Sequence, residues 1–274
     1  MFSLIKIEWL KIKKYPAFWW MLGIIAISYP GVNSMFLSAY KNMTKNEDIL
    51  SQIASSFLGN PFAFPEAWHS IAYFSSAFIM IPAVLVIMLI NNEYSYKTYR
   101  QNIIDGWSRR DFMLSKLIDV GIISLVVTII YILVTIFFGI AADGTTTSQW
   151  KQQLQYIPLF SLQTFAQLSL AFIAGYFIRK AFLALGIFLF YSIVVENILV
   201  GYLKFKNISA ARFLPFEISD RLVPPPAFWS KFGPDGEAKY KVVLATIPTH
   251  IALTIALTTI VWVICFWHNK KRDL

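Results

Sequence analysis

The 274-residue chain is poor in charged residues and almost devoid of cysteine. Charged side chains make up 14% of the sequence, whereas hydrophobic residues make up 57%. Soluble domains carry about a quarter charged residues, so this composition excludes an ordinary soluble domain and indicates a membrane protein. The single cysteine, Cys265, excludes a disulfide within the chain, and we interpret it as a small apolar packing residue.

The motifs of nucleotide binding and of common enzyme classes are also absent. The sequence contains no phosphate-binding P-loop, no zinc-binding HExxH pair and no GxSxG nucleophile motif. We therefore expect a chain that is not an enzyme, with no catalytic residue and no cofactor of its own. Its three histidines, His69, His250 and His268, are scattered. Packing near the helix ends is the favoured role of His69 and His250, with metal ligation as the weaker alternative.

Six hydrophobic stretches are long enough to span a bilayer. About 20 apolar residues in a helix cross its hydrocarbon core of roughly 30 Å. The first stretch is the weakest, because Pro30, Gly31 and Asn33 interrupt its outer end. The predicted fold is an all-α polytopic membrane protein that forms a single transmembrane domain over residues 1–274. The predicted spans are Ala17–Ser38, Trp68–Ile90, Met113–Ile140, Tyr156–Ile178, Phe182–Leu203 and Leu244–Trp267.

Basic residues predict which side of the membrane each loop faces. With the N-terminus inside, the inner segments hold 14 Lys and Arg, whereas the two short outer loops hold three. The other seven lie in the long loop 204–243, which the positive-inside rule counts weakly. Both termini are therefore predicted to be cytoplasmic. The net charge of +9 reflects this topology, and we expect no nucleic-acid partner.

The segment before the first span has the pattern of an interfacial helix. Apolar side chains recur from Phe2 to Ile12 on one helical stripe, and the lysines lie largely off it. We interpret residues 1–16 as a helix in the inner membrane interface, ended by Pro16. An ordinary positively charged flank is the alternative.

Between the second and third spans lies a charged segment, residues 91–117, with five basic and three acidic residues. Gly106 is a natural stop for a short helix. Ser108 is a good N-cap for the next helix, and Asp111 follows three residues later, as in a capping box. Four interleaved aromatic residues favour contact with a protein groove over a solvated loop. The segment predicts a compact cytoplasmic knob that contacts a partner.

This segment resembles the first cytoplasmic loop of type-2 ABC exporter permeases. The shared order is Glu, then Thr-x-Arg, then Gly-x-Ser-Arg, then Lys. The stretches "IEWLKIKK" and "RFLPFEISDRLVPP" resemble the N-terminal pattern of the family and the Leu-Pro stretch of its bacteriocin-immunity-like branch. In one departure, Lys97 stands where the family often has glycine before the threonine. The resemblance assigns coupling to an ATPase to Glu8, Glu93, Thr98, Arg100, Gly106, Ser108, Arg109 and Lys116.

The resemblance also implies partners and a location. The family has an interfacial helix and six spans, and its coupling helix between spans 2 and 3 docks on a separate ATP-binding subunit. That subunit would carry the ATP and magnesium. A second permease copy, identical or related, would complete the transporter in a bacterial inner membrane. ATP hydrolysis would move a hydrophobic, peptide or lipid-like substrate outward or extract it from the membrane.

Three of the polar residues within the predicted spans are candidates for a functional role. An ionised carboxylate at the bilayer centre costs about 2.5–3.5 kcal/mol, so Glu196 in the fifth span should face protein or water. Two roles would satisfy this carboxylate. One is a contact to substrate or to a gate, and the other is a structural hydrogen bond to Asn197 or to a tyrosine. Gln163 and Gln167 lie four residues apart on the fourth span. They could line a polar path, but we favour a role in joining helices.

Two other functions compete with the ABC permease. A self-sufficient secondary transporter would use Glu196 as its ion or proton site, and a membrane adaptor would transport nothing. A secondary transporter needs no docking helix, so the knob favours the permease. The long loop 204–243 is too apolar for disorder and is expected to pack as a small outer cap.

Overall fold

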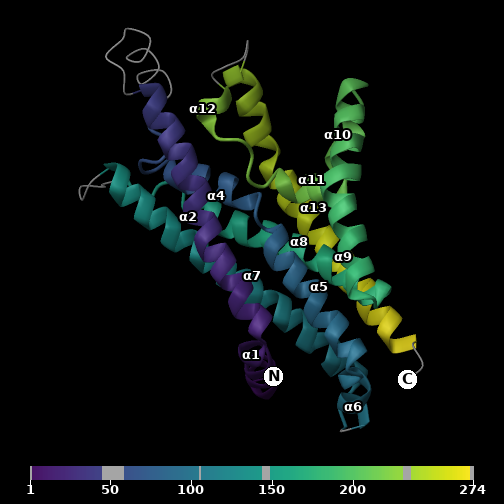
Figure 1. Cartoon of the computed structure of the whole chain (residues 1–274). Helices are drawn as coiled ribbons and strands as arrows, with labels where there is room; N and C mark the ends of the chain where they lie inside the picture. Colours follow the sequence, from purple (N-terminus) through teal and green to yellow (C-terminus); the bar gives the residue numbers. More distant parts are fainter. Residues whose placement is uncertain (1, 45–58, 105, 144–148, 231–235, 272–274) are drawn as a thin grey trace.

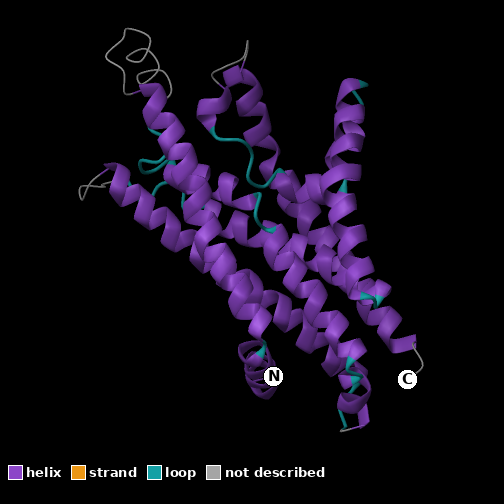
Figure 2. Cartoon of the chain, viewed as in Figure 1, coloured by secondary structure: helices purple, strands orange, loops and turns teal. Residues whose placement is uncertain are grey.

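The computed structural model describes residues 2–44, 59–104, 106–143, 149–230 and 236–271. These ranges contain helices and no strand (Figure 2). The prediction of an all-α protein is therefore confirmed. The first helix, α1 (Phe2–Lys14), and the last turns of α13 (Gly236–Lys271) lie at the same end of the bundle as α6 (Thr98–Ile104), as Figure 1 shows. We call this end the knob end.

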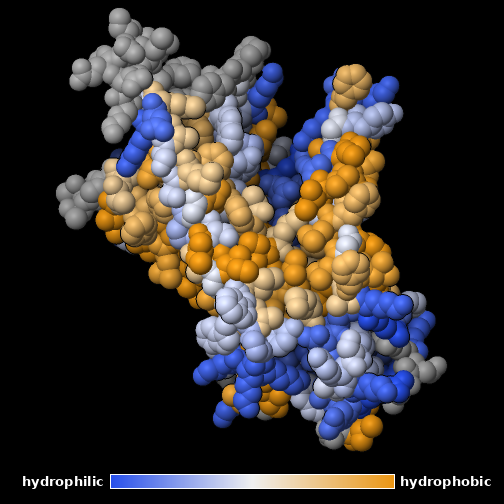
Figure 3. Space-filling view, in the orientation of Figure 1, coloured by the Kyte–Doolittle hydropathy of each residue, from blue (hydrophilic) through white to orange (hydrophobic). Residues whose placement is uncertain are grey.

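Five helices are long and apolar enough to cross a membrane, and a bent helix pair would make a sixth span. The pair consists of α4 (Ala67–Ser76) and α5 (Met80–Ser95), which meet at 49°. Figure 3 shows a hydrophobic band across the middle of the molecule and hydrophilic surface gathered at the knob end. The polytopic fold is thus confirmed. The five single helices are α2 (Pro16–Thr44), α7 (Arg109–Asp143), α8 (Tyr156–Ile178), the continuous α9–α10 unit (Ala181–Phe205) and α13.

The second predicted span is broken because of a proline. Pro82 has no N–H to donate to the carbonyl of Phe78 four residues before it. That carbonyl instead accepts a hydrogen bond from the N–H of Ile81 at 3.1 Å. The backbone between α4 and α5 tightens into three-residue turns, which change its direction. Counting apolar residues could not reveal this bend.

The expected interruption of the first span is wrong. Helix α2 runs through Pro30 without a break. Asn33 is buried, and its Nδ2 donates to the carbonyl of Tyr29 at 2.8 Å and to Oγ of Ser75 at 3.2 Å. The polar residue therefore joins α2 to α4 and does not end the helix.

Helix α8 is the centre of the bundle and contacts α5, α7 and α13. Aromatic rings fill these contacts. The rings of Tyr131 and Phe160 lie 4.5 Å apart, and those of Phe172 and Trp262 lie 4.7 Å apart. The indole N–H of Trp262 donates to Oγ of Ser169 at 3.0 Å, so its polar atom is satisfied inside the core.

The fifth span follows α8 after a tight connection. Only Arg179 and Lys180 separate the two helices, and Arg179 adopts a left-handed φ of +50°. The span contains one π-helical turn, Tyr191–Val195, between α9 (Ala181–Phe190) and α10 (Glu196–Phe205). Such turns insert an extra residue and are frequent at functional sites. Glu196 comes directly after it.

Part of the predicted outer cap lies inside the bundle. The segment after α10 forms a 3₁₀ turn (Ser209–Phe213), then α11 (Pro215–Asp220) and α12 (Ala227–Ser230). Helix α11 packs against α8 and α13, and α13 begins at Gly236 rather than at residue 244. The expectation of a cap over the whole loop is therefore wrong for α11. Its apolar side chains are buried among the spans because the bundle leaves room between α8, α10 and α13.

Candidate functional site

One buried lysine joins three helices at the knob end. The Nζ atom of Lys116 on α7 lies 3.0 Å from Oε2 of Glu8 on α1 and 2.7 Å from Oε1 of Glu93 on α5. It also lies 2.8 Å from Oδ2 of Asp119, one turn further along α7. The Lys116 side chain is only 5% exposed. We call these four residues the ion cluster.

A second lysine supports the ion cluster from its edge. The Nζ atom of Lys11 lies 2.8 Å from Glu8 and 3.8 Å from Glu93, and it also lies over the ring of Trp107. Burial alone would raise the pKa of Glu8, but the ammonium groups of Lys116 and Lys11 outweigh it and lower that pKa to about 2. Glu8 is therefore ionised at neutral pH, and its charge is balanced by the two lysines.

Three of the predicted coupling residues belong to the ion cluster. Glu8, Glu93 and Lys116 lie inside the protein, where they fix α1, α5 and α7 to one another. They do not present a surface for a partner to contact. Lys116 is 108 residues from Glu8 and 23 from Glu93, so no local sequence signal links them.

The knob has the local structure that its sequence predicts. Gly106 ends α6 with a φ of +98°, a conformation that favours glycine. The N–H of Trp107 donates to the carbonyl of Asn102 at 3.0 Å, as in a Schellman motif. The N–H of Asp111 donates to Oγ of Ser108 at 3.0 Å, and the N–H of Ser108 donates to Oδ2 of Asp111 at 3.3 Å. This capping box starts α7.

The start of α6 explains the one departure from the family pattern. Lys97 has a φ of +56°, in the left-handed region where glycine is favoured. The glycine that the resembling family often carries at this place would fit the same turn. Thr98 follows, and its Oγ1 donates to the carbonyl of Glu93 at 3.3 Å. Thr98 thus ties α6 to the end of α5.

One face of the knob is exposed and mixes apolar and charged groups. Tyr96 is 76% exposed and Ile104 is 82% exposed. The expectation of four aromatic residues available to a partner is wrong for Tyr99, which is buried and packs on Phe112 at 4.7 Å between ring centroids. Protein interfaces combine an apolar centre with a polar rim, and this face offers both kinds of group. We call this the docking face; it consists of Tyr96, Lys97, Arg100, Gln101 and Ile104.

The knob is also attached to the last helix. Nδ2 of Asn269 on α13 donates to the carbonyl of Arg109 at 2.8 Å, and Oδ1 of Asn269 accepts a bond from the Tyr99 hydroxyl at 3.2 Å. The guanidinium of Arg109 donates to the carbonyl of Lys270 at 3.0 Å. Arg109 therefore lies at the joint between the knob and α13. Asn269 is a functional candidate that sequence reasoning missed, because nothing near it in the chain marks it.

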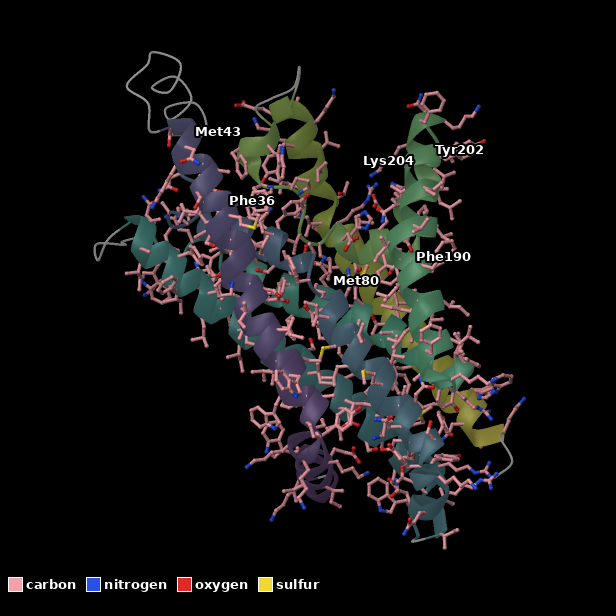
Figure 4. All side chains as sticks on the ribbon, viewed as in Figure 1. Phe36, Met43, Met80, Phe190, Tyr202 and Lys204 are labelled. Atoms are coloured by element: carbon pink, nitrogen blue, oxygen red, sulfur yellow. The ribbon has the colours of Figure 1, made fainter. Side chains whose placement is uncertain are left out.

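The other candidate region is a cleft of about 770 Å³ in the half of the molecule away from the knob. Figure 3 shows the hollow beside α10, with hydrophilic side chains in its depth. Figure 4 shows Phe36 and Met80 on other helices and Lys204 on the side of α10 that faces them, with Tyr202 on the opposite side. Phe36, Met80 and Lys204 line the cleft, so its walls are partly apolar and partly charged. We call it the transport cleft, after the role that we propose for it below.

Glu196 lies in the wall of the transport cleft and holds α11 in place. Its Oε1 accepts hydrogen bonds from the backbone N–H groups of Phe216 at 2.7 Å and Glu217 at 2.8 Å. These donors belong to the first turn of α11, which has no helical partners for them. The expected partner Asn197 points elsewhere and donates to the carbonyl of Ile193 at 2.9 Å.

The two glutamines of α8 bind the other end of α11. Nε2 of Gln163 lies 3.0 Å and Nε2 of Gln167 lies 2.7 Å from the same Oδ1 of Asp220. Gln167 is 11 residues, or about 16 Å, along α8 from its first residue, so α11 reaches deep into the bundle. Asp220 was missed because the sequence placed it in a surface loop. Both glutamines join helices, and both also line the transport cleft.

The histidines have separate environments. Nε2 of His69 contacts the carbonyl of Pro224 at 2.7 Å, and its ring stacks on Tyr156. His268 contacts the hydroxyl of Tyr176 at 3.2 Å, and His250 is buried on α13. Within the described ranges, no group of three or more His, Cys, Asp or Glu side chains is arranged to hold a metal ion.

A family model described as "ABC-2 family transporter protein" matches residues 4–195. The match includes most of α1, the whole ion cluster, the knob and the first part of the fifth span. No curated protein sequence matches the chain, and no solved structure does. The bacteriocin-immunity-like branch is not part of what the match shows.

Proposed function

This chain belongs to the ABC-2 family of transporter proteins, and from that premise we propose that it is the membrane subunit of an ATP-driven exporter. Permeases of this family are the membrane components of ABC transporters, and they normally work with a separate ATP-binding subunit. The observation that carries the proposal is the ion cluster behind the docking face. It links α1 to α5 and α7, and α5 and α7 are the two helices that flank the knob.

In the proposed mechanism, the ATP-binding subunit contacts the docking face. A push on α6 reaches α5 through Thr98, which donates to the carbonyl of Glu93. It reaches α7 and α13 through Tyr99, which packs on Phe112 and donates to Asn269. It reaches α1 through Glu8, and the hydroxyl of Tyr15 accepts a bond from Nδ2 of Asn92 at 2.7 Å. Removing one partner from a buried ion pair costs about 3–5 kcal/mol, so these helices move together more easily than they separate. Their tilt would open and close the transport cleft.

The proposed substrate is hydrophobic, peptide-like or lipid-like, and it moves outward or leaves the membrane. The transport cleft supports this class of substrate because the apolar side chains of Phe36 and Met80 line the same cleft as its polar groups. Glu217 is paired with Lys204 at 3.1 Å and Arg221 at 2.9 Å, so the polar side carries both signs of charge. Such walls suit an amphipathic molecule.

A second copy of the permease, or a related chain, is part of the proposal. The fifth span exposes large apolar side chains along its length, with Phe182 91% exposed and Ile198 64% exposed. A second permease packed beside this span would cover part of that surface. The proposed complex contains two permeases and two ATP-binding subunits in the inner membrane, with both permease termini in the cytoplasm.

The geometry gives less support to a self-sufficient secondary transporter. Such a protein would need Glu196 to exchange a proton or an ion. One carboxylate oxygen of Glu196 already accepts two backbone hydrogen bonds that hold α11. This arrangement is that of a helix cap.

Co-purification with the ATP-binding subunit encoded nearest to this gene tests the proposed function. We expect a stable complex in detergent and ATP hydrolysis that responds to the permease. Arg100→Glu reverses the charge at the centre of the docking face and should weaken the complex. Lys270→Glu is the matched control, because its side chain is exposed at the end of α13 and lies outside the docking face.

Failure of the wild-type chain to associate with the ATP-binding subunit would contradict the proposal. So would equal weakening by Arg100→Glu and Lys270→Glu, because the docking face would then have no special role. Transport by the purified permease alone, driven by a pH gradient, would favour the secondary transporter.

A further inference from the structure

A second hollow, of about 630 Å³, lies between α8 and α13 in the halves of these helices away from the knob. It shares no lining residue with the transport cleft. Its volume falls within the range of about 300–1,000 Å³ that is usual for small-molecule sites. We call it the lateral site, and its two ends differ in chemistry.

One end of the lateral site is polar and rich in hydrogen-bond acceptors. Oε1 of Glu66 accepts a bond from Nε2 of Gln153 at 2.8 Å, which orients the carboxylate. Oε1 of Gln153 is buried and has no hydrogen-bond partner among the described residues. The described residues that line the site include this one carboxylate and no lysine or arginine. The polar end therefore carries negative charge and an unused acceptor.

Two tyrosine rings at this end are held in fixed positions. The ring of Tyr156 stacks on His69 with centroids 4.1 Å apart. The hydroxyl of Tyr240 lies 3.4 Å from Nδ1 of His69 on the same imidazole. Both tyrosines line the lateral site. Aromatic faces and a carboxylate together form the surroundings that attract a cationic ammonium group.

The rest of the lateral site is apolar. Both α8 and α13 run towards the knob end. A higher residue number on either helix therefore means a greater distance from the polar end of the site. From Tyr240 to Ile251 the depth is about 16 Å at 1.5 Å per residue. One leaflet is half of a hydrocarbon core of roughly 30 Å, so this depth matches a leaflet. The apolar walls are Leu159, Leu162, Leu244, Ile247 and Ile251.

We propose that the lateral site binds an amphiphile with an ammonium headgroup, which places its cation between Glu66 and the two tyrosines and its apolar tail along α8 and α13. An anionic headgroup would be repelled by the Glu66 carboxylate, and an uncharged headgroup would leave that carboxylate without a counter-charge. The ammonium can belong to a membrane lipid or to a soluble amphiphile. The inference goes beyond the proposed function and holds for the permease with or without an ATP-binding subunit.

A photoreactive probe tests the proposal on the full-length chain. The probe is dodecylammonium with a diazirine on its alkyl chain, and the permease is held in nanodiscs of phosphatidylglycerol. We expect saturable labelling of the peptides that contain Leu159–Leu162 and Leu244–Ile251. A probe with the same tail and a sulfate headgroup should label these peptides weakly and without saturation.

Variants separate a built site from general contact with lipid. Glu66→Gln keeps the shape and removes the charge, and it should raise the half-saturating probe concentration by about five- to tenfold. Ile247→Trp fills the apolar part and should abolish saturation. Glu237→Gln is the matched control, because Glu237 is exposed in the first turn of α13 and does not line the site. It should leave labelling unchanged.

The source of the ammonium group follows from the lipid composition. If a lipid is the natural ligand, adding phosphatidylethanolamine to the nanodiscs should reduce labelling by competition. If labelling is unchanged, the site selects soluble amphiphiles, and the proposal still holds. Equal labelling by the sulfate probe, or equal effects of Glu66→Gln and Glu237→Gln, would overturn it. A loss of ATPase binding would leave this result unaffected, so the two proposals fail separately.

Discussion

At the scale of single residues, the balance of buried charges holds the helices at the knob end together. Lys116 faces three carboxylates within 3.0 Å, and Lys11 supplies the second positive charge from the edge. Removing the lysine or one of its partners would leave an unpaired charge buried in the protein, which is strongly destabilising. The ion cluster therefore acts as one unit that holds α1 to the bundle.

Replacing Lys116 with methionine should destabilise the protein strongly. The substitution keeps the length of the side chain but leaves Glu8, Glu93 and Asp119 close together without their main counter-charge. We expect a loss of about 3–5 kcal/mol, seen as a lower midpoint in thermal unfolding of the purified permease. Lys11→Met is the control and should cost less than about 1 kcal/mol, because the Lys11 side chain is 39% exposed. Equal losses would show that burial of the lysine is unimportant.

Acidic pH should release part of the stability that Glu8 contributes. The neighbouring lysines lower the pKa of Glu8 from 4.5 to about 2 in the folded protein, so its ionised form is favoured by folding. This contribution is complete above pH 4.5 and is lost as the pH falls from 4.5 towards 2. The stability difference between the wild type and Glu8→Gln, measured by unfolding at a series of pH values, should shrink across this window. A difference that grows on acidification would contradict the assigned pairing.

Glu196 should tolerate the loss of its charge better than the loss of its oxygen. Glu196→Gln retains an oxygen that accepts the N–H bonds of Phe216 and Glu217, so assembly and ATP-driven activity should survive. Glu196→Leu leaves both N–H groups without their partner, at a cost of about 1–3 kcal/mol for each. Thermal unfolding and transport by the complex measure the two effects. Loss of transport in the Gln variant, with normal stability, would point to a proton or ion site.

At the scale of elements, the knob depends on the left-handed backbone conformation at the two ends of α6. Helix α6 has only seven residues, so its two ends determine its orientation. The left-handed residues Lys97 and Gly106 stand at its two ends, and the capping box of Ser108 starts the next helix. The docking face lies between these turns. Changes at the turns should therefore alter the direction of the face without disturbing the spans.

Gly106→Val should uncouple ATP hydrolysis from transport. A β-branched residue at a φ of +98° is strained by about 1–3 kcal/mol, so the end of α6 should rearrange. We expect the complex to hydrolyse ATP while transport per ATP falls. Gly186→Val is the control, since Gly186 lies in a helix with nothing within 4 Å of an added Cβ. A normal ratio of transport to hydrolysis in Gly106→Val would argue against a coupling role for this turn.

At the scale of the whole molecule, the knob, α1 and the last turns of α13 lie on one side of the apolar band (Figures 1 and 3). The other end of α2, where Figure 4 labels Met43, lies at the far side of the same band. The asymmetry of basic residues predicts a cytoplasmic knob end, and this orientation stays a prediction. This orientation is what an ATP-binding subunit in the cytoplasm would require.

Thiol labelling of intact cells tests the orientation. Met43 is 62% exposed near the end of α2, and Lys270 is exposed at the end of α13. Met43→Cys should react with a membrane-impermeant thiol reagent from outside, and Lys270→Cys should react only after the membrane is opened. The native Cys265 is buried and should give little background. The reverse pattern of labelling would invert the topology and remove the basis for cytoplasmic docking.

The sequence by itself determined those features whose signals are local. Apolar runs of about 20 residues defined the spans, because a helix must satisfy its own backbone hydrogen bonds within the membrane. Gly106 and the pair Ser108 and Asp111 marked the ends of helices, because their hydrogen bonds reach only three to five residues. The resemblance around residues 91–117 indicated the family that the match over 4–195 then showed.

Only the tertiary structure decided which distant groups meet. Lys116 and Glu8 are separated by 108 residues, and Gln167 and Asp220 by 53. Their pairing depends on how whole helices pack and on the space left between α8, α10 and α13, into which α11 fits. Neither a hydropathy window nor a local motif contains that information. The lateral site likewise exists only because α8 and α13 bring the tyrosines at their outer ends, Tyr156 and Tyr240, beside one histidine.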